Sequence, residues 1–327
     1  MTAVQGPPGA WAKNGTPIID THAHLLGGKR SGPQAAAQSA LGIMDQFSVT
    51  TTIIMPPPQT VGQNLGDRLE SYSAITPGER PGFYFLGGGG SLNVMIQKSV
   101  RSGNVTGEMR KAFRKRAEEI LKKGAIGFGE MTAEHVSRRS GHPYVSAPPD
   151  HPLFLLLAEI AAKHGVPIDL HMEAVVEDMP RPENLSSTNP EVLKANIEGF
   201  ERLLAHNRKA IIIWAHLGWD NTGKRTPSLT RRLLEKHPNL FLNLKSAKGT
   251  IKKTRLERKK ALQPRWKTLI EDYPDRFMIG SDIKYRGEGR TSGGGMKVYR
   301  KILKQLSPDT QKKVGFENAV RIFKLPR

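Results

Sequence analysis

The chain of 327 residues contains no cysteine. This absence excludes structural disulfides, thiol catalysis and zinc held by thiolate ligands. A chain without cysteine is compatible with oxidising and with reducing surroundings, so its composition leaves the compartment open. Any metal site in this protein must therefore be built from imidazole and oxygen ligands.

Long hydrophobic runs are also missing. No apolar segment is long enough to cross a bilayer, and residues 1–9 lack the basic-then-apolar pattern of a signal peptide. Hydrophobic residues make up 37% of the chain, which is compatible with a globular core. We therefore expect a water-soluble protein, either cytoplasmic or exported with a leader that this sequence does not include.

Acidic residues are scarce beside basic ones. The chain has 30 Asp and Glu against 50 Lys and Arg, a formal net charge of +20. Such a charge favours anionic partners, whether nucleic acid, an anionic membrane surface or a negatively charged substrate. Basic residues are densest in residues 245–267, where Glu257 is the only acid. Aromatic residues are sparse there and no nucleic-acid motif is present, so we interpret the region as a solvated face and rank nucleic-acid binding second.

Strand-like and helix-like patterns alternate along the chain. We predict strands at residues 18–24, 51–55, 82–86, 125–130, 167–171, 210–216, 240–244 and 277–281. Helical patterns lie between them, at residues 107–123, 153–164, 190–206, 228–236 and 264–272. Eight such units predict an α/β fold of the (β/α)8 TIM-barrel type, with loops at residues 87–90 and 131–150 carrying substrate contacts. Residues 17–327 would form this single domain and residues 1–16 an N-terminal arm.

Histidines and carboxylates close the predicted strands. His22 and His24 are two residues apart on a strand, so both imidazoles would point to the same face, which Asp20 shares. Side chains at the carboxyl ends of barrel strands converge on one site, and a chance coincidence of so many ligand types there is improbable. The sequence therefore predicts a metal centre built from His22, His24, Glu130, His171, His216 and Asp282.

These ligands suit particular metals and a particular chemistry. Imidazole and carboxylate groups favour Zn²⁺, with Mn²⁺, Ni²⁺ or Fe²⁺ as alternatives. If two ions bind, Glu130 would bridge them, with His22, His24 and Asp282 completing one site and His171 and His216 the other. A single ion is the alternative. Because bound water becomes acidic on a divalent metal, we expect Asp282 to act as the general base that takes its proton.

The same residues resemble the metal-site series of the amidohydrolase superfamily. The run Asp20 to His24, the strand-end Glu130, His171 and His216, and Gly280-Ser281-Asp282 carry the resemblance. Residues 317–323 (ENAVRIF) are similar to the closing helix of its amidohydrolase-related branch. The resemblance spans residues 20–323 and implies a metal-dependent hydrolase on a TIM barrel. Many binuclear members carry a carboxylated lysine on strand four, whereas this chain has Glu130, as TatD-like members do.

Substrate and reaction are the next predictions. Lys245, Lys284, Arg286 and His135 lie near the predicted strand ends and could hold an anionic group of a small substrate. The bond cleaved could be an amide, a lactone or other ester, or a phosphoester. Two enzymatic alternatives are a mononuclear decarboxylase of the aminocarboxymuconate semialdehyde type and a TatD-like nuclease. A barrel that only binds a partner through its basic face is a third possibility.

Overall fold

A computed structural model describes residues 15–26, 32–63, 66–75, 82–140, 142–246, 251–287 and 294–326. Most of the predicted N-terminal arm lies outside the described residues, as do residues 247–250 of the basic region. No helix in the described part of the chain is long and apolar enough to span a membrane.

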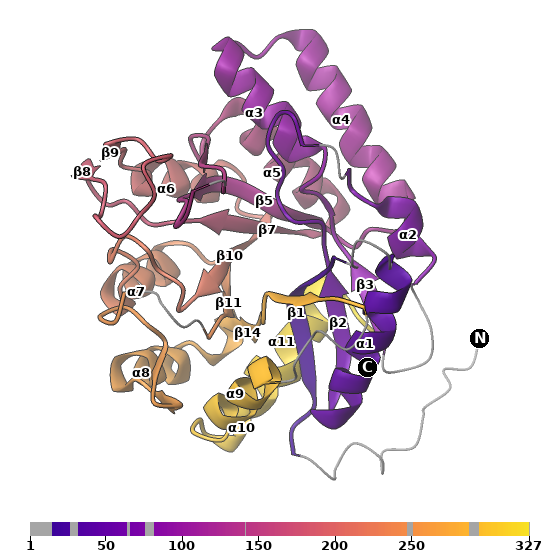
Figure 1. The fold of residues 1–327 in the computed structure, drawn as a ribbon, viewed down its shortest axis with the longest axis vertical. Helices are drawn as coiled ribbons and strands as arrows, with labels where there is room; N and C mark the ends of the chain where they lie inside the picture. Colours follow the sequence, from indigo (N-terminus) through magenta and orange to yellow (C-terminus); the bar gives the residue numbers. More distant parts are fainter. Residues whose placement is uncertain are drawn as a thin grey trace.

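A mostly parallel sheet forms the centre of the molecule (Figure 1). Its strands follow the order β3-β2-β1-β14-β11-β10-β7-β5-β4. Their bounds are Ile18–Leu25 (β1), Val49–Ile54 (β2), Gly82–Phe85 (β3), Gly87–Gly88 (β4), Phe128–His135 (β5), Pro167–Met172 (β7), Ile211–Leu217 (β10), Leu240–Leu244 (β11) and Phe277–Ile279 (β14). All the predicted strands are present, and most are buried along their whole length, as expected of a parallel sheet covered by helices.

The two ends of this strand order are neighbours in the chain. Only Leu86 separates β3 from β4, and its backbone N–H donates to Ile54 of β2 over 2.9 Å. On the other side, the N–H of Ile126 donates to Phe85 over 2.9 Å, and Gly87 pairs in register with Phe128 of β5. Residues 87–88 therefore belong to the sheet, and the prediction that they begin a loop is wrong. Gly87 fits there because an added Cβ would lie 2.7 Å from Ile120.

Helices lie around the outside of the strands (Figure 1). They are Pro33–Gln46 (α1), Leu69–Ser73 (α2), Leu92–Ser102 (α3), Gly107–Lys122 (α4), Pro152–His164 (α5), Ile197–His206 (α6), Pro227–Lys236 (α7), Pro264–Asp272 (α8), Gly294–Leu303 (α9), Pro308–Lys312 (α10) and Asn318–Phe323 (α11). Local signals set their ends: Thr106 and Thr226 cap α4 and α7, and Gly165 ends α5 in a left-handed conformation.

Two predicted segments differ from the structure. Residues 190–196 do not extend α6; instead Val192–Leu193 (β9) pairs with Met179–Pro180 (β8). The Asn196 side chain accepts from Val175 N and donates to Glu173 O, so tertiary hydrogen bonds compete with the helix there. The segment 131–150 is partly strand, because β5 continues to His135 and pairs with Val145–Ser146 (β6).

Candidate metal centre

All six predicted ligands come together at the carboxyl ends of the parallel strands. β1 supplies two of them, β5, β7 and β10 supply one each, and the last follows β14. Each of these side chains lies within 3.6 Å of another member of the group, so the six form one cluster. All six side chains are at most 6% exposed. The group consists of His22, His24, Glu130, His171, His216 and Asp282.

Glu130 lies between two pairs of histidines. Its Oε1 is 2.8 Å from His171 Nδ1 and 3.0 Å from His216 Nε2. Its Oε2 is 3.6 Å from His22 Nε2 and 3.4 Å from His24 Nε2. Each carboxylate oxygen therefore faces one pair, which is the placement that a bridging ligand requires.

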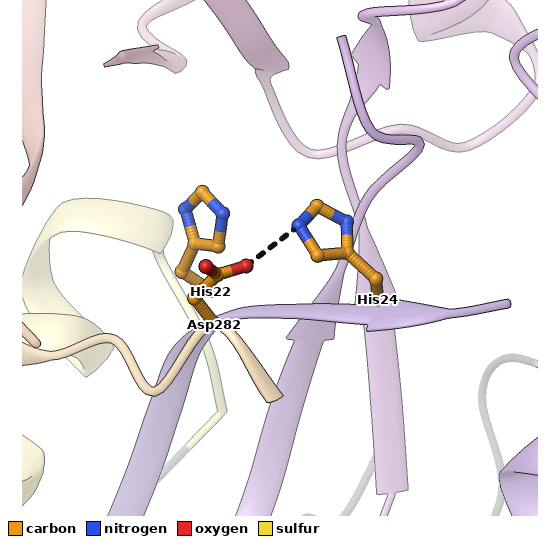
Figure 2. A group of neighbouring side chains, drawn as sticks. All are labelled: His22, His24 and Asp282. Atoms are coloured by element: carbon orange, nitrogen blue, oxygen red, sulfur yellow. Dashed lines mark ion pairs between the residues drawn. The ribbon is translucent and has the colours of Figure 1, made fainter. Parts of the chain in front are cut away.

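Asp282 faces the pair on β1. Figure 2 shows its carboxylate pointing towards His24, whose Nε2 lies 3.0 Å from Asp282 Oδ1. The other ring nitrogen, His24 Nδ1, lies 2.9 Å from the carbonyl oxygen of Met55, which fixes the ring. Lys245 Nζ pairs with Asp282 Oδ2, and Lys284 Nζ lies 3.8 Å from Asp282 Oδ1.

The donor set fits a divalent cation. Two groups have ligand atoms within 4.8 Å of one another: His22, His24 and Asp282, and His22, Glu130 and His216. His22 Nε2 is buried without a hydrogen-bond partner, and so is His216 Nδ1. Buried imidazole nitrogens without a partner are costly unless something binds them, and a cation is what this set of imidazoles and carboxylates would bind.

Two of the ligands sit on an unusual backbone. His216 has φ of 65° and Asp282 has φ of 51°, in the left-handed region that few residues other than glycine, asparagine and aspartate adopt. Backbone hydrogen bonds hold both conformations, because Asp282 N donates to His22 O over 2.8 Å and His216 N donates to Asn243 Oδ1 over 2.7 Å. Residues held in such conformations cluster at functional sites.

Asp169 and Asn243 support the site and were not among the predicted site residues. Asp169 Oδ1 lies 3.1 Å from His22 Nδ1, an ion-pair distance without hydrogen-bond alignment. Asn243 Nδ2 donates to Asp169 Oδ2 over 2.9 Å, while its Oδ1 accepts from the backbone of His216. Both side chains are fully buried. Asp169 could have been predicted from the sequence, because it lies two residues before His171 on the same strand and therefore points to the same face.

Asp20 supports the other side of the site. Its carboxylate accepts from the backbone N–H of Ser281 over 2.8 Å and from the Ser281 hydroxyl. The backbone N–H of His22 also donates to it over 3.3 Å. Asp20 therefore ties β1 to the residue before Asp282.

Burial and neighbouring charges together set the ionisation of the site. Burial alone raises a carboxyl pKa, but Lys245, Lys284 and His24 hold the pKa of Asp282 well below its ordinary value. Hydrogen bonds from histidines, His171 first, likewise outweigh burial and hold the pKa of Glu130 well below its ordinary value. Both carboxylates are therefore ionised at neutral pH and available as ligands.

A cavity of about 650 Å³ opens onto these residues. His24, Glu130, His171, His216 and Asp282 form its floor, and the predicted contacts His135 and Lys284 line its wall. Burial, followed by the nearby His171 and His142, lowers the pKa of His135 to about 3, so this imidazole is neutral. Other wall residues are Arg138, Arg139, His142 and Trp219.

The remaining two predicted contacts lie elsewhere. Lys245 is buried beneath the cavity, where its Nζ lies 3.3 Å from the centre of the Trp219 ring and pairs with Asp282. Arg286 is exposed and is absent from the described lining of the cavity, so its role in substrate binding stays a prediction.

Fold and site together define a mostly parallel α/β protein with a cluster of histidines and carboxylates at its strand ends. The chain belongs to the amidohydrolase family, whose model matches residues 99–325. Members of this family bind divalent metals, and membership supports an enzymatic role. No curated protein matches the sequence.

Several solved structures share the fold. An apo structure from Agrobacterium tumefaciens has a TM-score of 0.52 at 12% identity, and the match covers 95% of this chain and 97% of that chain. A probable 2-pyrone-4,6-dicarboxylic acid hydrolase from Acinetobacter baumannii has a TM-score of 0.51 at 10% identity, covering 94% and 99%. The 5-carboxyvanillate decarboxylase from Sphingomonas paucimobilis has a TM-score of 0.50 at 12% identity, covering 95% and 100%.

Proposed function

We propose that this protein is a metal-dependent hydrolase of a small anionic substrate, built as a single closed (β/α)8 barrel over residues 17–327. The position of Glu130 between two histidine pairs, with Asp282 beside one of them, carries the proposal. One fold neighbour is named a hydrolase and another a decarboxylase, so the fold serves both reactions. Glu130 favours the hydrolase, because its two carboxylate oxygens face different histidine pairs and a bridging carboxylate can serve two ions.

The protein would hold its ions through the six clustered side chains. His22, His24 and Asp282 would bind one ion, and His171 and His216 the other, with Glu130 shared between them. Zn²⁺ suits these ligands, and Mn²⁺, Ni²⁺ and Fe²⁺ are alternatives. When bound, such an ion acts as a Lewis acid and lowers the pKa of a coordinated water to about 7.

Asp282 is the residue that we assign to proton transfer. Its carboxylate is ionised, lines the cavity and is fixed by His24 on one oxygen and by Lys245 on the other. A carboxylate in that position accepts a proton from the attacking water and delivers it to the leaving group. Lys245 stabilises the ionised form and orients it, since its own ammonium is held against Trp219.

The cavity wall would select the substrate. Lys284, Arg138 and Arg139 line it, and Lys284 Nζ lies 3.8 Å from Asp282 Oδ1. Neutral His135 offers a hydrogen-bonding group nearer to His171. Cations in such a wall favour a substrate with a carboxylate or phosphate. The scissile bond would be an amide, a lactone or other ester, or a phosphoester.

The test combines metal analysis with the variant Asp282→Asn. Asparagine tolerates the left-handed backbone at this position but cannot accept the proton. Against a panel of lactones, amides and phosphoesters, we expect turnover by Asp282→Asn to fall by about 10²- to 10⁴-fold, the usual range for a general base. Elemental analysis after loading with Zn²⁺ or Mn²⁺ should give two ions per chain for the unchanged protein.

A matched control is Asp178→Asn, which makes the same chemical change at an exposed carboxylate that is paired with Lys194. This variant should keep full turnover. Unchanged turnover by Asp282→Asn would remove Asp282 as the base. Failure to bind any metal after loading would remove the hydrolase proposal altogether, and carbon dioxide release from a carboxylated substrate would replace it with decarboxylation.

A further inference from the structure

A second charged feature lies around a hairpin outside the metal centre. Glu257–Arg258 (β12) pairs with Ala261–Leu262 (β13), and exposed cations surround this hairpin. The neighbouring segments pack together, because Gln305 Nε2 donates to Lys260 O over 3.2 Å and to Lys301 O over 2.7 Å. We call this surface the basic hairpin face and define it by Lys252, Lys253, Arg258, Lys259, Lys260, Arg265, Lys301 and Lys304.

The cations of the basic hairpin face lack anionic partners. Within the described part of the chain, none of them forms an ion pair with a carboxylate. Helix α7 shows the contrast, since Arg231 pairs with Asp272 while Arg232 and Lys236 both pair with Glu201. Positive charge on the hairpin face is therefore not balanced locally, which raises its attraction for an external anion.

The one acid within the hairpin does not neutralise these side chains. Glu257 Oε2 accepts the backbone N–H of Lys260 over 2.8 Å, and Glu257 Oε1 accepts from the Ser246 hydroxyl over 3.3 Å. The Glu257 carboxylate therefore stabilises the turn by binding its backbone. The lysine ammonium groups at the tip remain exposed.

The turn itself places lysines where the backbone favours other residues. Arg258 pairs with Ala261, so Lys259 and Lys260 form a two-residue loop, and their φ angles are 52° and 67°. Such a turn favours asparagine and glycine, because both central residues adopt the left-handed conformation. Two lysines in this turn are unfavourable for the fold, which points to a use for their charge.

The face offers charge without apolar or stacking groups. Its aromatic residue, Trp266, is buried, and the large hydrophobic side chains found exposed in the described residues are Val176 and Val192, outside this face. A membrane surface is normally bound by cations together with inserted apolar groups, and single strands by exposed aromatic rings. Cations alone match a duplex, whose phosphates present a dense and regular row of negative charge.

We propose that the basic hairpin face binds the phosphate backbone of double-stranded nucleic acid without reading its sequence. The root of the hairpin is tied to the end of β11, since Ser246 follows Lys245 in the chain and its hydroxyl donates to Glu257 over 3.3 Å. This binding is independent of the proposed hydrolase activity.

The test uses a double variant that removes two positive charges and places residues that favour positive φ in the turn. Lys259→Asn with Lys260→Gly supplies the residues that the two-residue turn favours, so the variant should unfold at a temperature no lower than the unchanged protein. Fluorescence anisotropy with a labelled DNA duplex of about 20 base pairs would be followed from roughly 50 to 200 mM salt. We expect the full chain to bind with a steep salt dependence, and the double variant to lose about 1.8 from the slope of log K against log salt, because each phosphate contact contributes about 0.9.

The matched control is Lys111→Gln with Lys115→Gln on α4, which removes the same charge at exposed positions away from the hairpin. This control should keep the slope and affinity of the unchanged protein. An equal loss in both double variants would show diffuse attraction and overturn the proposal. Absence of duplex binding at low salt, or binding only to vesicles containing phosphatidylserine, would also overturn it.

Discussion

Two buried carboxylates, Asp282 and Glu134, show how neighbours decide the charge of a single residue. Lysines surround Asp282, and its pKa is low despite burial. Glu134 on β5 is also buried, and its carboxylate accepts a hydrogen bond from the neutral Ser146 hydroxyl over 2.6 Å. Burial, with Glu173 adding to it, raises the pKa of Glu134 to about 7. Below about pH 7 Glu134 is therefore mostly protonated, whereas Asp282 is ionised.

The raised pKa of Glu134 makes stability depend on pH. The unfolded chain ionises this group near 4.5, whereas the folded protein keeps its proton up to about 7. The stability present below about pH 4.5 is therefore lost as the pH rises through 7. The Glu134→Gln variant cannot ionise at this position, so its unfolding free energy at about pH 8 should exceed that of the unchanged protein by a few kcal/mol. Near pH 4.5 the difference in unfolding free energy should be much smaller.

Chemical denaturation across this pH range measures the effect. The control is Glu183→Gln, because Glu183 is an exposed carboxylate for which no such gain is expected. A constant difference between Glu134→Gln and the unchanged protein at all pH values would contradict a shifted ionisation.

At the scale of elements, Asn243 joins three strands. It lies on β11, donates to Asp169 on β7 and accepts from the His216 backbone on β10. An added Cβ on Gly280 would lie 2.5 Å from Asn243, so a glycine is needed at the end of β14 to admit this side chain. Asn243 therefore helps to set the spacing of strands that carry predicted metal ligands.

Asn243→Ala should weaken both metal binding and the fold. The substitution leaves Asp169 and the His216 N–H without their partners, and each unsatisfied buried group costs about 1–3 kcal/mol. Loss of a residue that orients ligands typically lowers metal affinity by about 10- to 100-fold. Competition with a chromogenic chelator measures the affinity, and denaturation measures the fold.

Asn239→Ala is the matched control for this prediction. Asn239 lies just before the other end of β11, and its Nδ2 donates to the carbonyl oxygens of Leu204 and Ala210. It should therefore lose comparable stability while keeping its metal affinity. If both variants lose affinity equally, Asn243 has only a structural role.

The sequence predicted elements and ligands well where the signal is local. Strand-end histidines and helix caps need only spacing and residue type, so His22, His24 and the end of α5 at Gly165 were all recognisable. The structure brings the six predicted ligands together, while their binding of a metal stays a proposal. Residues 190–196 and Asn243 could not be predicted, because their conformations depend on hydrogen bonds between segments far apart in the chain.

At the scale of the whole molecule, the candidate metal centre gathers side chains from β1, β5, β7 and β10 and from the residue Asp282 after β14. β1 pairs with β14, and ligands come from both ends of the chain as well as from its middle. A cation bound there would stabilise the folded chain alone, since the unfolded chain cannot assemble the site.

Metal removal should therefore lower the melting temperature in a concentration-dependent way. Free metal at about 1,000 times its Kd contributes about 4 kcal/mol of stability by mass action. Calorimetry after dialysis against a chelator should show a lower Tm, with recovery on adding Zn²⁺ or Mn²⁺. A Tm that ignores both treatments would mean that no ion binds the native state at this site.

The contact between Lys245 and Trp219 holds a fluorescent side chain beside the candidate metal centre. The chain has four tryptophans, and Trp214 and Trp266 are buried in the core. Trp219 instead lines the cavity, with ring centres 5.8 Å from His216 and 6.1 Å from His171. Its fluorescence therefore responds to charge at those imidazoles and at the ammonium above it, so occupancy of the site can be read by emission from the unlabelled protein.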